Sequence, residues 1–214
     1  MTARYVFPVD GPPLESGVVT IRGDRIVAVD SSRRRQVDVD WGNAALLPGL
    51  ANAHVHLDLS GLRGRCPPEN DFVKWLRHVL QHRRARSPRQ VEADVRDGLQ
   101  ACLASGTTLL ADVSAQGMSW DSLSRAPVRA IANYELLGLT TTRAHEAWSG
   151  ALEWLKTHPA TPTCRPGLSP HAPYSVRASL FQAVSLLARA RRVPMTIHLS
   201  ETLEELQLLR DHHQ

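Results

Sequence analysis

Two histidines separated by a single residue, His54 and His56, are the feature of this sequence that most directly suggests chemistry. Side chains alternate along an extended strand, so this spacing places both imidazoles on the same face. Two neutral imidazoles that project from one strand form half of a site for a divalent metal such as zinc or iron. The alternative is a pair of surface or hydrogen-bonded histidines. The apolar approach through Leu46, Leu47 and Leu50 favours the metal site.

A third histidine and a glutamate stand together much later in the chain, in the run Ile197-His198-Leu199-Ser200-Glu201. His198 ends a predicted strand, and Glu201 lies at the start of a predicted helix. A carboxylate in that position can face the same pocket as the imidazole and transfer protons. A structural histidine and a glutamate stabilised by the dipole of its own helix are the alternatives, and position alone leaves both open.

Two further polar residues follow predicted strands. His171 lies between Pro170 and Pro173, which stiffen the loop and could hold the imidazole over a substrate. A capping or packing histidine is the alternative. Asp58 comes two residues after His56 and could hydrogen-bond a neighbouring side chain or the substrate, or could be an ordinary loop carboxylate.

The elements that would position these residues form two parts. Residues 1–47 contain the short β-rich runs Val18–Ile21 and Arg25–Val29 around Gly23-Asp24, which is a hairpin signal. We therefore predict a small β unit over 1–47 that packs on the remainder of the chain. Residues 48–214 form the second part, in which strands and helices alternate.

Five βα units are predicted in the second part. The strands are predicted at 53–57, 107–113, 128–137, 167–170 and 194–199. The helices are predicted at 72–86, from 87 to about 106, near 120, at 145–156, from 175 and at 201–209. Alternating strands and helices favour a parallel sheet that either closes as a (β/α)8 barrel or stays open. No GxGxxG follows a strand, which disfavours a dinucleotide fold. In a barrel, functional residues lie at the carboxyl ends of the strands, where these histidines are predicted.

Composition narrows the class of protein further. The chain has 214 residues with 43% hydrophobic and 21% charged residues and a formal net charge of +4, which is typical of a globular protein. The absence of an apolar run of about 18 residues and of a signal-peptide pattern leads us to expect a cytoplasmic protein that does not bind membranes. Aromatic residues make up only 5%, and we expect no nucleic-acid partner. The oligomeric state is left open.

The motifs together resemble a known family. The run LPGLANAHVHL at 47–57 resembles the metal-binding signature of the amidohydrolase superfamily, in the branch that contains cytosine deaminase, guanine deaminase, methylthioadenosine/S-adenosylhomocysteine deaminase and the triazine hydrolases. Three further segments match in the right order, namely GTT at 106–108, SPHAPYS at 169–175 and IHLSET at 197–202. The run DFVKWL at 71–76 is similar to the aminofutalosine deaminase subgroup.

This resemblance implies a (β/α)8 barrel, here about five of its eight strands, and a small β-sandwich to which residues 1–47 contribute. It implies that His54, His56 and His198 bind one divalent ion, zinc or alternatively iron, and that Glu201 is the catalytic proton shuttle. His171, Asp58 and Trp75 are the expected substrate contacts.

The implied function is metal-dependent hydrolysis of carbon–nitrogen bonds other than peptide bonds. Deamination of a small purine-like or other N-heterocyclic substrate is the first expectation, with water activated by the metal near neutral pH. Cleavage of an amide or C–Cl bond is an alternative, and so is a remnant that binds ligand without turnover. Incidental histidines on a structural βα protein are a third reading, which four ordered motifs disfavour.

The family pattern also includes three more strands, a histidine after the sixth and an aspartate after the eighth. The sequence ends at Asp211-His212-His213-Gln214, and these two histidines do not match the strand-six position. We therefore expect the chain to be a truncated N-terminal half that is inactive as a deaminase by itself.

Overall fold

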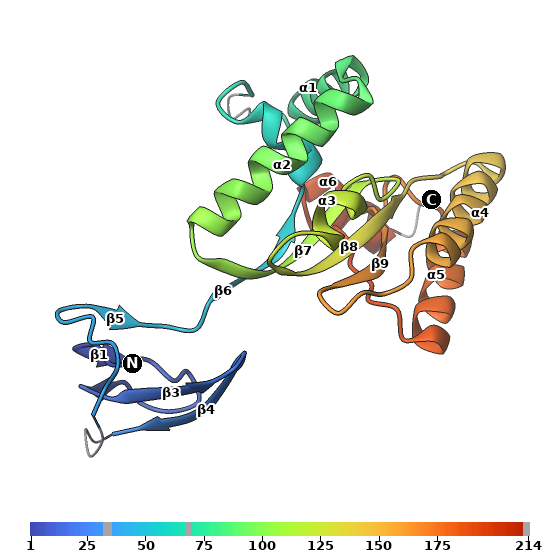
Figure 1. Cartoon of the computed structure of the whole chain (residues 1–214). Coiled ribbons are helices and arrows are strands. Elements are labelled where there is room, and N and C mark those ends of the chain that lie inside the picture. Colours follow the sequence, from blue (N-terminus) through green and yellow to red (C-terminus); the bar gives the residue numbers. More distant parts are fainter. Residues whose placement is uncertain (32–35, 67–69, 212–214) are drawn as a thin grey trace. The chain divides into compact units, whose positions relative to one another are not determined.

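The computed structural model describes residues 1–31, 36–66 and 70–211 (Figure 1). His212 and His213 lie outside these described residues. Contacts between residues divide the chain into two compact units, Met1–Leu50 and Ala51–Gln214. The boundary predicted from the sequence was residue 47.

The first unit is made of short strands. Strand β1 (Tyr5–Val6) lies between β2 (Leu14–Glu15) and β5 (Ala45–Leu46). The predicted hairpin is confirmed as β3 (Val18–Arg22) and β4 (Arg25–Asp30), which pair in antiparallel fashion. Gly23 in its turn has a φ of +61°, which glycine adopts without strain. The membership of this unit in a larger β-sandwich stays a prediction.

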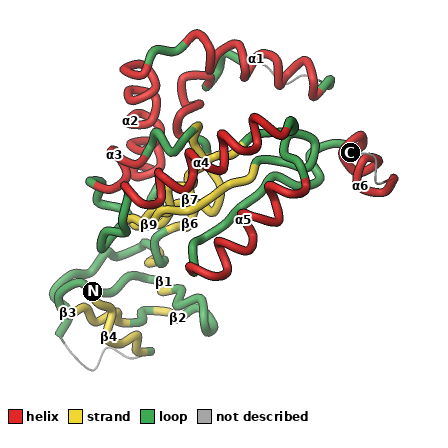
Figure 2. The backbone as a smooth tube through the Cα atoms, turned by 90° about the vertical axis from the view of Figure 1, so that its right-hand side faces the viewer, coloured by secondary structure: helices red, strands yellow, loops and turns green. Residues whose placement is uncertain are grey.

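The second unit contains a four-stranded sheet in the order β6-β7-β8-β9, which can be followed in Figure 1. Figure 2 shows strands of this sheet in yellow with helices, in red, beside them. These strands are β6 (Leu50–Val55), β7 (Thr107–Ala115), β8 (Arg129–Leu136) and β9 (Cys164–Pro170). β8 pairs in parallel with both β7 and β9. Each neighbour in the sheet is also the next strand along the chain, and helices connect them. The predicted α/β class is therefore confirmed, with the strand order of a βα progression.

The predicted fifth strand, 194–199, is not a regular strand. It makes one parallel bridge, between Leu168 and Met195, and two flanking hydrogen bonds. Leu168 donates its N–H to the Pro194 carbonyl at 2.9 Å, and Thr196 donates to the Leu168 carbonyl at 3.1 Å. The segment is extended and runs along the edge of β9, but only one of its sides finds a partner among the described residues. The expectation of about five strands is corrected to four and this bridge.

The strand that carries the first histidine has an apolar sequence, which is typical of a buried strand, but in the described structure it is largely exposed. β6 is an edge strand that has only β7 beside it, and four of its six residues are exposed. Its apolar sequence was a correct signal for a strand. Burial, however, depends on what covers the strand, which its own residues do not determine.

Within the residues that the structure describes, six α-helices and one 3₁₀ helix complete the second unit. They are η1 (Leu57–Leu62), α1 (Phe72–Ala85), α2 (Pro88–Ala104), α3 (Trp120–Ser124), α4 (Thr141–Thr157), α5 (Ala178–Arg191) and α6 (Leu203–Asp211). The predicted capping box at the start of α2 is present, and the Ser87 N–H donates to the Gln90 side chain at 2.9 Å. α5 and α6 begin two or three residues later than predicted, because Ser175 and Glu201 lie in the preceding turns.

Alternation along β8 separates the core from the site. Ala130, Ala132, Tyr134 and Leu136 belong to the main hydrophobic cluster, and the Tyr134 ring lies 5.6 Å from that of Trp154 on α4. Glu135 belongs to the opposite face because side chains alternate along a strand. The sheet therefore packs one face against helices and directs polar groups from the other. Among the described residues, none of the helices combines the length and the apolar character needed to cross a membrane.

The packing of α2 on η1 generates a stability prediction. A Cβ on Gly98 would lie 2.1 Å from Ser60 Oγ and 3.1 Å from Leu57 Cδ2, both on η1. Gly98→Ala should therefore lower the free energy of unfolding by about 1–3 kcal/mol, although alanine is ordinarily the better helix former. Urea unfolding followed by tryptophan fluorescence measures this. Gln100→Ala, exposed on the same helix, is the control and should change stability by less than about 0.5 kcal/mol. Equal stability of the two variants would contradict the close packing.

Candidate metal centre and cavity

Three histidines from two distant segments converge in the second unit. The Nε2 atoms of His54 and His56 are 3.2 Å apart, and those of His56 and His198 are 3.0 Å apart. One ligand atom from each of the three residues lies within 4.8 Å of the others. The structure thus brings together the three imidazoles that the sequence singled out as metal ligands.

The spacing of these nitrogens fits a single ion. Zinc binds histidine nitrogen at about 2.0–2.1 Å, so two nitrogens on one tetrahedral ion are about 3.3 Å apart. Separations of 3.0 and 3.2 Å are close to this value. Imidazole is a preferred ligand of zinc and of other divalent transition metals. The donor set and its geometry therefore suit such an ion.

Local backbone geometry explains how His54 and His56 point the same way. His54 is the penultimate residue of β6, and His56 is the cap residue from which η1 begins. The chain turns directly after His56, and the Leu57 N–H donates to the Asp112 carboxylate of β7 at 2.8 Å. Asp112 is fully buried and also accepts a hydrogen bond from the Ser119 hydroxyl. The neighbouring strand therefore holds the turn that aims His56.

The backbone of the loop that follows β9, which contains His171, positions His198. Its N–H donates to the His171 carbonyl at 2.7 Å, and its Nδ1 lies 3.2 Å from the same oxygen. When Nδ1 carries the proton for that contact, Nε2 is left with its lone pair free for a metal. One carbonyl thus sets both the position and the tautomer of the imidazole.

Burial favours the neutral, metal-binding form of two of these imidazoles, those of His54 and His56. Burial lowers the pKa of His56 to about 4, and it also lowers the pKa of His54, with the neighbouring His198 adding to the effect. A neutral imidazole has a free lone pair, so no proton has to be displaced near pH 7. Nδ1 of His56 is buried and has no hydrogen-bond partner within the described ranges.

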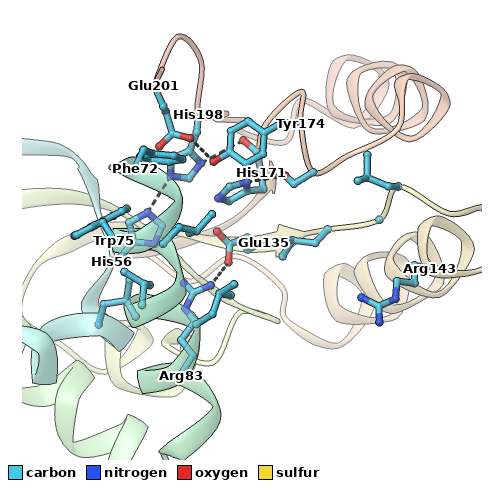
Figure 3. Close-up of a pocket in the computed structure, with 18 of the residues that line it drawn as sticks. His56, Phe72, Trp75, Arg83, Glu135, Arg143, His171, Tyr174, His198 and Glu201 are labelled. Carbon is cyan, nitrogen blue, oxygen red and sulfur yellow. Dashed lines mark hydrogen bonds and ion pairs between the residues drawn. The ribbon is translucent and has the colours of Figure 1, made fainter. Parts of the chain in front are cut away.

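Glu201 lies beside the three histidines, just before α6. Its Oε2 accepts a hydrogen bond from the Tyr174 hydroxyl at 2.6 Å (Figure 3), and its N–H donates to the Glu205 carboxylate at 2.7 Å. Burial and this contact with Glu201 raise the pKa of the Tyr174 hydroxyl, which therefore stays protonated and donates. Glu201 itself is exposed, so it can exchange protons with a ligand or with water.

A cavity of about 790 Å³ opens next to this cluster. Its polar end is formed by six side chains, those of His54, His56, Glu135, His171, His198 and Glu201. Its walls are largely apolar, from Leu59, Phe72, Trp75, Leu76, Val79, Leu80, Leu137 and Leu139. A small-molecule site has this volume and this combination of an apolar wall with a few convergent polar groups.

Two of the three predicted substrate contacts line the cavity. Trp75 projects from α1, and its ring lies 5.7 Å from that of Phe72. The His171 ring lies 4.6 Å from the His198 ring, and its Nδ1 is 2.7 Å from the Ser175 hydroxyl. Burial lowers the pKa of His171, which favours the neutral imidazole.

The third, Asp58, is placed elsewhere. It is 4% exposed, is not among the lining residues of the cavity, and pairs with Arg83 at 3.2 Å. It also accepts a hydrogen bond from the Ala115 N–H. Burial raises the pKa of Asp58, and the Arg83 guanidinium opposes that rise. Of the three readings of Asp58 that the sequence left open, this position corresponds to contact with a neighbouring side chain, that of Arg83.

Sequence reasoning missed Arg83 and Glu135, which form an ion pair of 2.7 Å at the cavity. The basic run around Arg83 has the composition of a solvated helix end, but Arg83 and Arg86 both make ion pairs with buried carboxylates. A signal for Glu135 was present, because a charged residue within an otherwise apolar strand is rarely buried without a partner. The partner lies 52 residues away, which local patterns do not indicate.

Comparison with known proteins places the chain in a family. The model of the amidohydrolase family matches residues 45–214. The chain belongs to the amidohydrolase family. A 5-methylthioadenosine/S-adenosylhomocysteine deaminase of Nitratidesulfovibrio vulgaris is 30% identical over 172 residues, which cover 78% of this chain and 39% of the deaminase.

Two solved structures share the fold of this amidohydrolase chain. The aminofutalosine deaminase of Helicobacter pylori, solved with methylthio-coformycin, has a TM-score of 0.80 and 24% identity over 96% of this chain and 52% of its own. An adenosine deaminase of Xanthomonas campestris with bound zinc has a TM-score of 0.78 and 24% identity over 100% of this chain and 52% of its own. The chain spans about two fifths to one half of the length of these relatives.

Because the three imidazoles converge, we expect them to coordinate one metal ion together. Replacing any one of them by alanine should weaken zinc binding by about 100-fold or more, since even groups that only orient a ligand contribute 10–100-fold. Cobalt absorption followed by competition with zinc measures the affinity. His145→Ala, an exposed histidine on α4, is the control and should bind as the unchanged chain does. Normal binding by His54→Ala would contradict the three-histidine centre.

The anchor residue Asp112 predicts a pH dependence of stability. Burial raises its pKa to about 7, from an ordinary value of 3.8. Between these two values the folded chain keeps this proton while the unfolded chain releases it. The contribution of the Asp112 proton to the free energy of unfolding is therefore complete below pH 3.8 and is lost as the pH rises through 7. The loss amounts to about 1.4 kcal/mol for each unit by which the pKa is shifted. Asp112→Asn should remove this component, as measured by urea unfolding of both proteins from pH 4 to 8. Parallel pH profiles would contradict it.

Proposed function

We propose that this chain carries the metal-binding part of a hydrolase that deaminates a purine-like or other N-heterocyclic substrate. The observation that carries the proposal is the meeting of three histidine Nε2 atoms at the polar end of a cavity that also contains a carboxylate, Glu201. The deaminases among the similar proteins support the class of reaction. The zinc of the Xanthomonas campestris structure supports zinc as the ion, and iron is the alternative.

In this proposal His54, His56 and His198 hold the ion. A divalent ion there would act as a Lewis acid that makes water nucleophilic near neutral pH. The lowered pKa values of His54 and His56 favour their neutral form, and three imidazole ligands carry no negative charge that would reduce the positive charge of the ion.

Glu201 is the proposed proton shuttle. The Tyr174 hydroxyl holds one of its oxygens at 2.6 Å, which leaves the other oxygen free to take a proton and deliver it to a ring nitrogen of the substrate. That proton comes from the attacking water, and its transfer to the ring nitrogen makes the ring carbon more electrophilic. The second proton of the same water passes to the amino group, which leaves as ammonia as the ring carbonyl forms. Tyr174 acts here as a positioning residue because it orients the carboxylate and does not itself exchange the proton.

His171, Trp75 and Phe72 are proposed to bind the heterocycle. The two aromatic rings on α1 offer an apolar surface against which a planar ring can stack. His171 faces the cavity from the end of β9 and can hydrogen-bond a ring nitrogen. The proposed small-molecule substrate therefore lies between α1 and the carboxyl ends of the strands.

Binding tests the proposal directly. Calorimetry with adenosine, 5-methylthioadenosine and guanine should detect binding of at least one of them to the zinc-loaded chain, and His54→Ala should abolish it. The control is His145→Ala, which leaves the cavity unchanged. If the zinc-loaded chain binds none of these purines, the proposal is wrong.

Ammonia release separates a catalyst from a protein that only binds ligand. Turnover by the zinc-loaded chain should fall about 100-fold or more in Glu201→Gln, since a general acid–base contributes 10²–10⁴-fold. Binding without ammonia release would support the alternative of ligand binding without turnover and would agree with the inactivity expected for the chain by itself. Release of chloride from a chlorotriazine, with no ammonia from purines, would favour C–Cl cleavage.

A further inference from the structure

One oxygen of Glu135 is buried without a partner at the cavity. Glu135 is 3% exposed near the end of β8. Its Oε2 accepts a hydrogen bond from Arg83 Nη1 at 2.7 Å. Its Oε1 is buried and has no hydrogen-bond partner in the part of the chain that the structure describes. A buried acceptor without a donor is costly, so such an atom in a cavity indicates a ligand group that satisfies it.

The unpartnered oxygen lies on the ligand side of the ion pair. In Figure 3 one carboxylate oxygen of Glu135 meets Arg83 and the other is on the side of His171. One ligand atom each from Glu135, His171 and His198 lies within 4.8 Å of the others. Glu135 and His171 make no direct hydrogen bond, and both residues line the cavity.

The charges around Glu135 specify what kind of group would bind. Arg83 pairs with Glu135 at 2.7 Å and with Asp58 at 3.2 Å, so two carboxylates share one guanidinium. Burial alone would raise the pKa of Glu135, but Arg83 and His171 outweigh it and lower that pKa, which leaves the carboxylate ionised. An ionised carboxylate oxygen accepts hydrogen bonds and donates none. The group that completes this site is therefore a donor.

A second metal ion is the competing explanation, and the geometry disfavours it. Such an ion would use Glu135, His171 and His198. Nδ1 of His198 is occupied by the His171 carbonyl, and its Nε2 is 3.0 Å from Nε2 of His56. One nitrogen lone pair cannot bind two ions, so a cation at Glu135 would take His198 from the three-histidine centre.

We propose that Glu135 Oε1 accepts a hydrogen bond from an N–H of the substrate ring, and that Glu135 thereby determines specificity. The substrates it selects are N-heterocycles that present a lactam N–H or an amino group to the end of β8, rather than rings with only acceptors on that edge. Arg83 is a positioning residue in this arrangement, because it holds the carboxylate by its other oxygen. The inference rests on the proposed function and refines its substrate class.

Matched ligands that differ by one donor test this subsite. Purine against 2-aminopurine adds an amino group, and hypoxanthine against 1-methylhypoxanthine removes one N–H. In at least one pair, the ligand with the extra donor should bind the zinc-loaded chain about tenfold or more tightly, as expected for a hydrogen bond to a charged acceptor. Calorimetry measures both affinities.

Two variants of Glu135 should reduce the ratio of the two affinities within such a pair to about twofold or less. Glu135→Gln replaces the charged acceptor by a neutral amide of the same shape, and Glu135→Asp keeps the charge but withdraws the oxygen. The second variant serves if the first does not fold, which thermal unfolding reports. Leu139→Ala, at the cavity wall, is the control and should change both members of a pair equally.

The outcomes separate the subsite from the proposed function. If purines bind in a zinc-dependent way but without a donor preference, or with a preference that survives both variants, the subsite is wrong and the proposed function stands. An equal loss for both members of a pair would show that Glu135 only supports His171, which also overturns the subsite. Two equivalents of cobalt on the unchanged chain and one on Glu135→Gln would establish the cation instead. If no purine binds at all, both proposals fall.

Discussion

The convergence of three imidazoles from segments far apart in the chain is the constraint on which the rest of the site depends. Two of the rings, those of His56 and His198, reach the meeting point because a neighbouring strand or the loop that follows it holds the local backbone. Asp112 of β7 fixes the turn after His56, and the His171 carbonyl after β9 fixes both the backbone and the ring of His198. Parallel strand order is what makes this work, since it gathers the carboxyl ends of all strands at one edge of the sheet. The proposed metal centre therefore depends on the sheet, which places the segments that carry the three histidines.

A second layer of charge lies beneath the imidazoles. Arg83 links Asp58, beside the first histidine strand, to Glu135 at the end of β8. Burying three charges is costly, and the mutual pairing offsets only part of that cost. Among the described residues of this network, Glu135 Oε1, Asp58 Oδ1 and Arg83 Nε have no hydrogen-bond partner, and Glu135 is the carboxylate that lines the cavity. A network that only stabilised the fold would be expected to satisfy all its members, so the imbalance points toward ligand binding.

Family membership and site geometry contribute different kinds of information. The match over residues 45–214 establishes the amidohydrolase family, and the structural similarity at 24% identity establishes the fold. Neither assigns a role to a particular side chain of this chain. Those roles rest on distances and burial: three nitrogens with the spacing that one ion requires, a carboxylate oriented by Tyr174, and two aromatic rings from α1 at the wall. The relatives are about twice as long, so the reaction of the whole protein is a matter for experiment.

Local pattern in the sequence determined the four strands of the sheet in the second unit, most helix positions and the identity of the residues that meet at the centre. The spacing of His54 and His56 is a strand property, and the capping box before α2 is a property of four consecutive residues, so both could be recognised without knowing the fold. Only the tertiary structure decided that β6 is exposed, that Asp58 turns toward Arg83 and away from the cavity, and that Glu135 keeps one oxygen unpaired. The physical reason is the same in each case. Burial and charge pairing depend on what lies across the sheet or on the next helix, and those partners are separated in sequence by tens of residues.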